Sequence, residues 1–565
     1  MTAHVEAFPG WGVRAVAYAV LLVAFAAPVS LEPGARTFAP GPDTRLYLWT
    51  IGWDLHALRT DPLGIFDANI FFPETKTLAY SEHLIGAAAL ALPLSFFTSN
   101  LALLLNFVLL ASTLITALGC DRLARECGSS PRGALLAGIL GAFSGPRLGR
   151  LTQAHLATLH LVPWALAFAV RYLREGRRLD LLLTLGLFTL QATTSGHGGL
   201  FLALALTLVF GIALVLRHVR AGTLVRDVGA VGALILAANL PFVIPYYEVK
   251  QKVGLTRVLE DAEGYAPGAG AWISAPTRAQ QALLSALPSL RRAADEANAS
   301  LFPGFVFGAL ALAGFGRVLR GRRLDGATLM AGLAFAALWL TLGPAFGLYR
   351  LGYALIPGFD LIRVPSRFFL LAIPALAVLA ALALDRIRRP AMAGGLLLVA
   401  TLECIPVPWD APRDPVEIPP IDVWAASQPH PFRLVELPVP RPDNSVRQAR
   451  FHSEYMLHSA AHWQPMLNGY SSLVPPRLES LYAELFDFPT EKGLQALERL
   501  GGRYVVIHTD MYQPDRWAEK ERELSQFGDR IILAQVAGEG RAYTLVRANS
   551  FAKTEPQQDE PPKQP

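Results

Sequence analysis

The sequence predicts a mainly helical protein that crosses a membrane many times and ends in a smaller α/β domain. Of the 565 residues 17% are charged and 52% are hydrophobic, whereas soluble globular proteins carry about 25% charged residues. Apolar runs of about 17–25 residues, long enough to cross a bilayer as helices, recur as far as Cys404. After Trp409 the hydrophobic runs shorten to the length of strands.

The first apolar run, residues 11–29, predicts an uncleaved membrane span. It is long for the hydrophobic part of a signal peptide, and Ala26-Ala27-Pro28 is a poor cleavage site. The net charge of +5 does not indicate nucleic-acid binding, because the arginines sit in short loops between apolar runs. The cysteines predict small hydrophobic packing residues rather than disulfides or metal ligands. They are Cys120, Cys127 and Cys404.

Arginine-rich loops set the predicted topology, since such loops face the cytoplasm. They lie at 171–178, 217–226, 317–323 and 386–389, with Arg122, Arg125 and Arg132 as a weaker fifth. If the 84–97 and 101–118 segments both crossed, the first of these loops would lie outside. The shorter 84–97 segment is therefore predicted to be interfacial or re-entrant. The result is about eleven spans plus interfacial helices, with the N-terminus in the cytoplasm and the C-terminus outside.

Three regions follow from this topology. Residues 1–408 form the predicted transmembrane domain, with outer loops at 31–83 and 248–300. Residues 409–553 form an extracytoplasmic α/β domain, and the Pro-, Gln-, Lys- and Glu-rich tail 554–565 is predicted to be disordered. In the α/β domain, strands are expected at 432–437, 503–508, 530–536 and 543–546, and helices at 477–485 and 490–500.

The 31–83 loop gathers carboxylates, imidazoles and indoles beside the membrane. Asp43 follows Pro-Gly-Pro just beyond the first span and is a candidate general base for an acceptor hydroxyl. It is equally placed to cap a helix that starts at Asp-Thr-Arg. Asp54 and His56 fall on an expected interfacial helix. The far end of the loop supplies the remaining polar candidates, namely Asp67, Asn69, Glu82 and His83.

Polar residues inside membrane segments are costly and mark functional candidates. They lie near the predicted outer ends of several spans and are suited to line one cavity, or alternatively to form interhelical hydrogen bonds. They are Ser144, Arg147, Arg150, Gln153, His155, His160, Gln191, Thr194, Ser195 and His197. No His, Asp and Glu set in the sequence has the spacing of a metal site.

The stretch Asp360-Leu-Ile-Arg363-Val-Pro365-Ser366-Arg367 ends an outer loop and begins a span. Proline suits a first helical turn, and helix N-termini attract anions. Two guanidinium groups there predict a phosphate site, because guanidinium binds phosphate in a bidentate way. The alternative is that Arg363 and Arg367 contact lipid headgroups by snorkelling.

With these residues placed, the chain resembles the GT-C superfamily of membrane glycosyltransferases, and more narrowly bacterial GT-C-like proteins related to the YfhO-type family. The matching pieces are the Gly41-Pro-Asp43 turn, the helix opening at Glu82-His83, the 248–300 loop, Asn69-Ile-Phe-Phe-Pro73 and Arg363-Val-Pro-Ser-Arg-Phe368. Many members carry a second acidic residue beside the first, but here Thr44 follows Asp43. That departure leaves open whether a divalent cation is required, and Asp54 or Asp67 would then take the place of the second acidic residue.

The resemblance implies transfer of a hexosyl or pentosyl group from a polyprenyl-phosphate donor, with membrane lipids around it. The acceptor would be a glycan, lipid or protein on the outer face of a bacterial inner membrane. Asp43, with Asp54, would be catalytic. The substrate-binding residues would be Arg363, Arg367, His56, Asp67, Asn69, Glu82, His83, His155 and His197. Two rivals are a lipid or polysaccharide transporter, and an inactive scaffold that binds envelope polymer through Trp463, Asn468, Tyr470 and His508.

Overall fold

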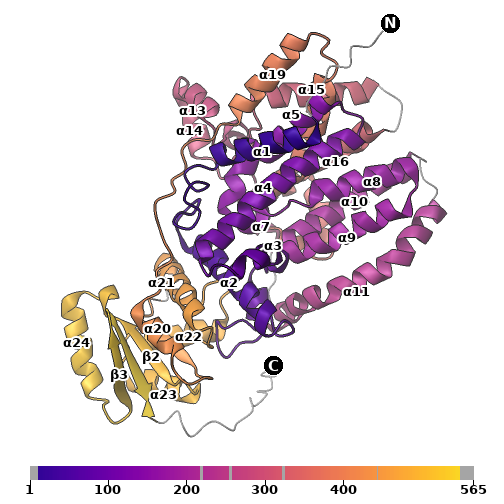
Figure 1. The fold of residues 1–565 in the computed structure, drawn as a ribbon. Coiled ribbons are helices and arrows are strands. Elements are labelled where there is room, and N and C mark those ends of the chain that lie inside the picture. The colour runs from indigo at the N-terminus through magenta and orange to yellow at the C-terminus, as the bar shows by residue number, and fades with distance from the viewer. Residues whose placement is uncertain (1–9, 217–220, 254–257, 321–324, 442, 547–565) are drawn as a thin grey trace. The chain divides into compact units, whose positions relative to one another are not determined.

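The computed structural model describes residues 10–216, 221–253, 258–320, 325–441 and 443–546 (Figure 1). These residues form two compact units. The first, the membrane unit, comprises Met1–Pro40 and Glu82–Pro415, and the second, the C-terminal unit, comprises Gly41–Ser81 and Val416–Pro565. The predicted disordered tail, 554–565, lies outside the described residues.

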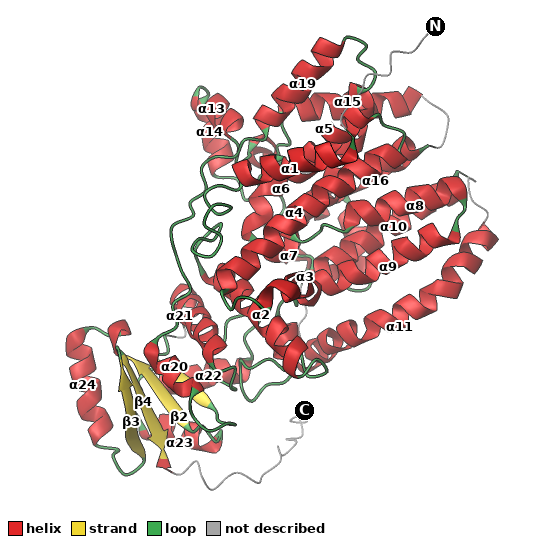
Figure 2. Ribbon diagram, in the orientation of Figure 1, coloured by secondary structure: helices red, strands yellow, loops and turns green. Residues whose placement is uncertain are grey.

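The membrane unit is built from helices, as Figure 2 shows by colour. Helices occupy all the places where spans were predicted. Among the described residues, five segments are long and apolar enough to cross a bilayer. They are Leu101–Glu126, Ala154–Glu175, Gly196–Val215, Val231–Val253 and Pro365–Leu384. The multi-pass membrane character is therefore confirmed, while the sidedness stays a prediction. The long helices are α1 (Trp11–Phe25), α4 (Leu101–Glu126), α5 (Pro131–Phe143), α8 (Val162–Glu175), α9 (Arg178–Thr194), α10 (Gly196–Val215), α11 (Ala221–Val253), α15 (Phe305–Arg320), α16 (Gly326–Thr341), α18 (Phe369–Leu384) and α19 (Pro390–Glu403).

Helix α18 is the centre of this unit. Nearly all its residues are buried, as expected for a helix that is apolar all round, and it packs against α4, α5, α15 and α16. Glycine allows the closest approach, because a Cβ on Gly314 of α15 would lie 2.2 Å from the Leu379 carbonyl oxygen. A buried ion pair joins Arg14 of α1 to Asp121 of α4, with an Nε–Oδ2 distance of 2.6 Å.

Shorter helices connect the long ones. The segment predicted to be interfacial or re-entrant forms α3 (Ile85–Ser95), whose 11 residues are too few to span a bilayer. Before α8 lie α6 (Gly145–Leu148), η2 (Gly149–Thr152) and α7 (Ala154–Ala157). The predicted outer loop 248–300 begins inside α11 and continues in short helices. They are α12 (Leu259–Gly264), η3 (Ala269–Ile273), α13 (Arg278–Ser285) and α14 (Pro288–Asp295). Before α18 lie η4 (Pro344–Phe346), α17 (Leu348–Leu355), η5 (Phe359–Leu361) and η6 (Pro365–Phe368).

The C-terminal unit contains a four-stranded sheet with strand order β1-β2-β4-β3. Strands β1 and β2 are parallel, and β4 is antiparallel to both β2 and β3. All four strands lie within three residues of the predicted positions, so the predicted α/β character is confirmed. The strands are β1 (Leu434–Leu437), β2 (Tyr504–His508), β3 (Ile531–Ala537) and β4 (Gly540–Leu545). The helices are α20 (Pro420–Ala426), α21 (Ser445–His458), α22 (Pro476–Leu485), α23 (Glu491–Arg499) and α24 (Pro514–Ser525), with η7 (Ser459–Ala461) and η8 (Thr509–Met511).

Residues 41–81 group with the C-terminal unit, whereas the sequence analysis placed them in the transmembrane domain. The reason is a set of specific bonds. The Met466 amide donates to the Asn69 carbonyl at 2.8 Å, and the Phe72 amide donates to the Met466 carbonyl at 2.9 Å. Helix α2 (Pro42–Thr60) packs against α21, and Arg45 forms an ion pair with Glu454. The segment also includes η1 (Thr77–Tyr80).

Candidate active site

The N-terminus of α10 carries a carboxylate from a distant part of the membrane unit. Glu82 accepts hydrogen bonds from the Gly196 amide at 2.7 Å and from the His197 amide at 3.3 Å. It also bonds to Nδ1 of the His197 ring. Ser195 caps the same helix through Oγ, which accepts from the Gly198 amide at 3.2 Å. Since free amides at a helix N-terminus attract anions, Glu82 already fills that position and fixes the His197 ring.

The opposite side of the His197 ring faces an arginine. Nη1 of Arg367 lies 2.8 Å from Nε2 of His197. Because a guanidinium group only donates, Nε2 must accept, and the ring proton must lie on Nδ1 toward Glu82. Glu82, His197 and Arg367 therefore form a carboxylate–imidazole–guanidinium chain, here called the relay. The His155 ring lies beside it, with its centroid 5.2 Å from that of His197.

A second arginine brings more positive charge to the relay. Burial, together with the nearby charge of Arg367, lowers the pKa of Arg150 to about 10. Arg150 Nη1 donates to Gln153 Oε1 at 2.9 Å. Burial raises the pKa of Glu82, but its interactions with His197 outweigh burial and hold the pKa well below its ordinary value. Arg150 and Arg367 thus supply two positive charges and Glu82 supplies one negative charge. The excess positive charge favours an anionic ligand.

Packing holds Arg367 in place. It lies in η6, where Pro365 occupies the first position and is buried. The next residue, Phe368, stacks on Phe359 with centroids 5.4 Å apart and contacts Phe201 of α10 at 5.2 Å. Pro365 begins the short helix and the buried Phe368 anchors its end, so that Arg367 between them points toward α10.

The two arginines that were predicted to bind phosphate together have different surroundings. Arg367 joins the relay, whereas Arg363 is exposed and its Cζ lies 5.4 Å from the centroid of the Tyr265 ring. His83 is buried: its amide donates to the Tyr246 hydroxyl at 2.9 Å and its ring lies near Phe242. Burial lowers the pKa of His83 to about 4, so this ring is neutral near pH 7.

Other polar residues in the helices follow the alternative of interhelical bonding. Gln191 accepts from the Leu161 amide and donates to the Thr158 carbonyl, both at 3.0 Å. Arg147 donates to the Ala157 carbonyl at 2.6 Å. These two side chains tie neighbouring helical segments together and do not belong to the relay.

The remaining predicted site residues lie in the C-terminal unit. Asp43 is exposed in the first turn of α2, but Gly41 is the N-cap residue and no side chain caps the helix. The Tyr470 hydroxyl donates to Asp43 Oδ1 at 2.8 Å. Asp54 is fully buried. The exposed Asp67 pairs with Lys76 at 2.8 Å.

His56 and Asn69 have packing roles within that unit. The His56 ring stacks on Trp463 with centroids 5.2 Å apart. Asn69 accepts from Trp49 Nε1 at 3.3 Å and donates to Ser459 Oγ at 3.0 Å. Both side chains therefore anchor the 41–81 segment to the helices of its unit. The sequence alone did not show whether their role is structural or is contact with a substrate.

The sequence analysis missed a cluster of four buried residues in the C-terminal unit, Asp422, Glu436, His458 and His508. His508, named among the sugar-contacting candidates, is buried and bonded to Glu436 at 2.7 Å. No spacing rule reveals this set, because its members come from four elements joined only by the fold.

Comparisons with known proteins confirm the fold. The Archaeoglobus fulgidus oligosaccharyltransferase in its apo form is similar over 90% of this chain and 71% of that chain, with 14% identity and a TM-score of 0.50. Lower TM-scores are found with ArnT from Cupriavidus metallidurans bound to undecaprenyl phosphate (0.47, 13% identity, 97% and 99% covered) and with the mycobacterial arabinofuranosyltransferase AftD (0.45, 15%, 88% and 36%). No family model matches the sequence, and no curated protein matches it. The predicted GT-C-type fold is therefore present.

Proposed function

We propose that this protein is a membrane glycosyltransferase that moves a sugar from a polyprenyl-phosphate donor to a cell-envelope acceptor on the extracytoplasmic face. The observation that carries the proposal is the guanidinium group of Arg367, held 2.8 Å from Nε2 of the His197 ring that bonds to Glu82, with the charge of Arg150 nearby. The GT-C-type fold supports the same class of protein. A partly buried excess of positive charge between apolar helices suits a lipid-linked phosphate, which brings both the compensating anion and an apolar tail.

The reaction places its charge on the phosphate. The acceptor oxygen forms a bond to the anomeric carbon of the sugar while the bond from that carbon to the phosphate oxygen breaks. The acceptor hydroxyl loses its proton to a general base, and the polyprenyl phosphate leaves with one more negative charge than it carried as a diester. Fixed cations that face this developing charge lower the barrier, and this is the role proposed for Arg367 and Arg150.

Glu82 is a positioning residue in this proposal. Its carboxylate is held by two amides and by the His197 ring, and its pKa is well below the ordinary value, so it is a poor proton acceptor. It orients His197, which in turn fixes Arg367. Asp43, the general-base candidate from the sequence, belongs to the C-terminal unit, where it is exposed and accepts from the Tyr470 hydroxyl through Oδ1; its catalytic role stays a prediction.

The relay does not provide a binding site for a divalent cation. Glu82 is the carboxylate of the relay, and its oxygens already accept from three donors. The nearby groups Arg150 and Arg367 would repel a cation. The residues of the relay therefore do not fit a cation site, and no step of the proposed reaction passes through one.

The proposal is tested with the purified full-length protein in detergent. Binding of a polyprenyl phosphate is measured by native mass spectrometry for wild type, Arg150→Ala, Arg367→Ala and the exposed control Arg292→Ala. Binding should weaken at least tenfold in the first two variants and stay at the wild-type level in the control. Equal binding by all four proteins would overturn the assignment of the phosphate site. Asp43→Asn should keep lipid binding but lose sugar transfer, and full transfer activity would remove Asp43 as the base.

A further inference from the structure

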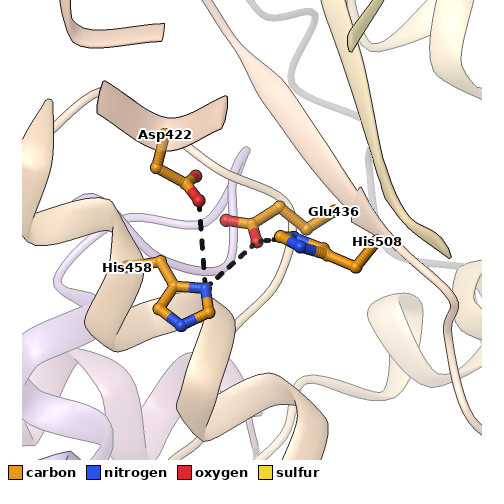
Figure 3. A group of neighbouring side chains, drawn as sticks. All are labelled: Asp422, Glu436, His458 and His508. Atoms are coloured by element: carbon orange, nitrogen blue, oxygen red, sulfur yellow. Dashed lines mark hydrogen bonds and ion pairs between the residues drawn. The ribbon is translucent and has the colours of Figure 1, made fainter. Parts of the chain in front are cut away.

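Four ligand-type side chains meet inside the C-terminal unit (Figure 3). They are Asp422 of α20, Glu436 of β1, His458 at the end of α21 and His508 at the end of β2. One oxygen or nitrogen atom from each lies within 4.8 Å of the corresponding atom of every other. All four side chains are buried, with Asp422 and Glu436 at 0% exposure.

The sheet register places these residues on one face. In the parallel pair β1–β2, Glu436 lies opposite Val506, and His508 is two residues further along, so it points to the same face as Val506. Helix α20 covers this face through Ile421, which packs with Val506 and Ala542. That contact brings the neighbouring Asp422 over the strand ends, and η7 follows His458 directly at the end of α21.

Several polar atoms of the cluster form no hydrogen bond within the protein. Among the described residues, neither carboxylate oxygen of Asp422 has a hydrogen-bond partner, and the same holds for Oε1 of Glu436 and Nδ1 of His458. Buried polar atoms without partners are costly and rare in native structures. Three of the four side chains therefore present atoms that a bound ion could use.

Apart from one direct hydrogen bond, the distances between these atoms are longer than those of close ion pairs and near those between the ligands of a metal ion. Oε2 of Glu436 lies 2.7 Å from Nε2 of His508 and 3.9 Å from Nδ1 of His458, and Nδ1 of His458 lies 3.9 Å from Oδ2 of Asp422. Four ligands at about 2.0–2.1 Å from a tetrahedral Zn²⁺ would be about 3.3–3.4 Å apart. The observed separations lie on both sides of that value, so small rotations of the side chains would complete the geometry.

We propose that Asp422, Glu436, His458 and His508 bind one divalent transition-metal ion, with Zn²⁺ the expected occupant. Two imidazoles favour Zn²⁺ over Ca²⁺ or Mg²⁺, which prefer oxygen ligands. The two carboxylates neutralise the charge of a divalent ion when both imidazoles are neutral. Four protein ligands leave a tetrahedral ion without an open position, which is typical of a structural site. The ion would tie α20 and α21 to the ends of β1 and β2.

Neighbouring residues hold the ligands in position, as is usual around metal sites. Asn468 brackets the backbone of Glu436: its Oδ1 accepts from the Glu436 amide at 2.7 Å and its Nδ2 donates to the Glu436 carbonyl at 2.9 Å. The Tyr455 ring stacks on His508 with centroids 5.2 Å apart, and its hydroxyl donates to the Pro438 carbonyl at 3.0 Å. These contacts fix a carboxylate and an imidazole toward the same point.

The test uses the full-length protein in detergent after treatment with a chelator. Zn²⁺ alone is added and its stoichiometry and affinity are measured by calorimetry and elemental analysis, for wild type, Asp422→Asn, His458→Gln and the exposed control His430→Gln. Wild type and His430→Gln should bind one Zn²⁺. The two ligand variants should bind at least about tenfold more weakly, since even loss of an outer-shell partner costs 10–100-fold.

A second measurement keeps the test decisive if a ligand variant fails to fold. Co²⁺ added to the wild-type protein should give the visible ligand-field bands of a four-coordinate ion, and Zn²⁺ should abolish them and raise the melting temperature. No binding by wild type, or equal binding by wild type and a folded Asp422→Asn protein, would overturn the proposal. Neither result would decide the question of glycosyl transfer, because that proposal is tested separately by polyprenyl-phosphate binding to the Arg150 and Arg367 variants of the membrane unit.

Discussion

Replacing Glu82 by glutamine tests whether the relay positions Arg367. In the wild-type protein the carboxylate accepts from the Gly196 amide, the His197 amide and the His197 ring. A glutamine side chain offers one accepting oxygen and one donating amide. If the oxygen turns to the backbone, the amide group faces His197 Nδ1, which must then accept. The proton then moves to Nε2, where it opposes the Arg367 donor 2.8 Å away.

If the glutamine amide is turned the other way, its NH₂ group faces the backbone N–H groups of α10. Either orientation sets a donor against a donor and removes at least one hydrogen bond to a charged group. Such a bond contributes about 1.5–3 kcal/mol, or about 10- to 150-fold in rate where the contact matters for the transition state. We therefore expect kcat/KM of Glu82→Gln to fall by about that factor, with a smaller loss in lipid binding.

The assay is transfer of a radiolabelled sugar from a polyprenyl-phosphate donor, with Glu260→Gln as an exposed control on α12. A double-mutant cycle makes the reasoning specific. Because Glu82 acts through Arg367, adding Glu82→Gln to Arg367→Ala should cost little beyond the loss of about 100- to 1,000-fold expected for Arg367→Ala alone. Activity of Glu82→Gln within twofold of wild type, or two losses that simply multiply, would refute the relay.

Two further predictions concern stability. Gly314→Ala would place a Cβ 2.2 Å from the Leu379 carbonyl oxygen, so we expect the free energy of unfolding to fall by about 1–3 kcal/mol and the melting temperature to drop. The control is Gly316→Ala on the same helix, where a Cβ would meet nothing within 4 Å, and this variant should melt at or above the wild-type temperature. Burial lowers the pKa of His452 to about 4, so the unfolded chain takes up its proton first and stability should fall as the pH drops from about 6.5 toward 4. His452→Gln should move the acid-unfolding midpoint, followed by tryptophan fluorescence, to lower pH, and an unchanged or higher midpoint would contradict this.

The elements of the fold were largely predictable because their signals are local. The four strands are short apolar runs between turn residues, and each was located within three residues of its observed position. The short 84–97 segment was recognised from its length and from the parity of the arginine-rich loops. Helix α24 was not predicted, because its sequence Pro-Asp-Arg-Trp-Ala-Glu-Lys-Glu-Arg-Glu-Leu-Ser is mostly charged and shows little apolar periodicity. For such a helix the contacts with its unit decide the structure more than the pattern does.

The sites were less predictable because they depend on long-range contacts. His197 and Arg367 were named as candidates, but their bond spans 170 positions in the sequence, and nothing local distinguishes Arg367 from the exposed Arg363. Similarly, Asp43 was identified as polar and near a helix start, while its partner Tyr470 lies 427 positions away. Polar residue type indicates candidates in such a chain, and only packing shows which of them meet.

The most direct measurement of the central claim is the product formed by the purified wild-type protein in lipid vesicles with a labelled polyprenyl-phosphate sugar and cell-envelope acceptors. The account predicts a covalently glycosylated acceptor and release of free polyprenyl phosphate, both reduced at least about 100-fold by Arg367→Ala. Movement of the labelled lipid across the bilayer without a covalent product would contradict it and indicate a transporter.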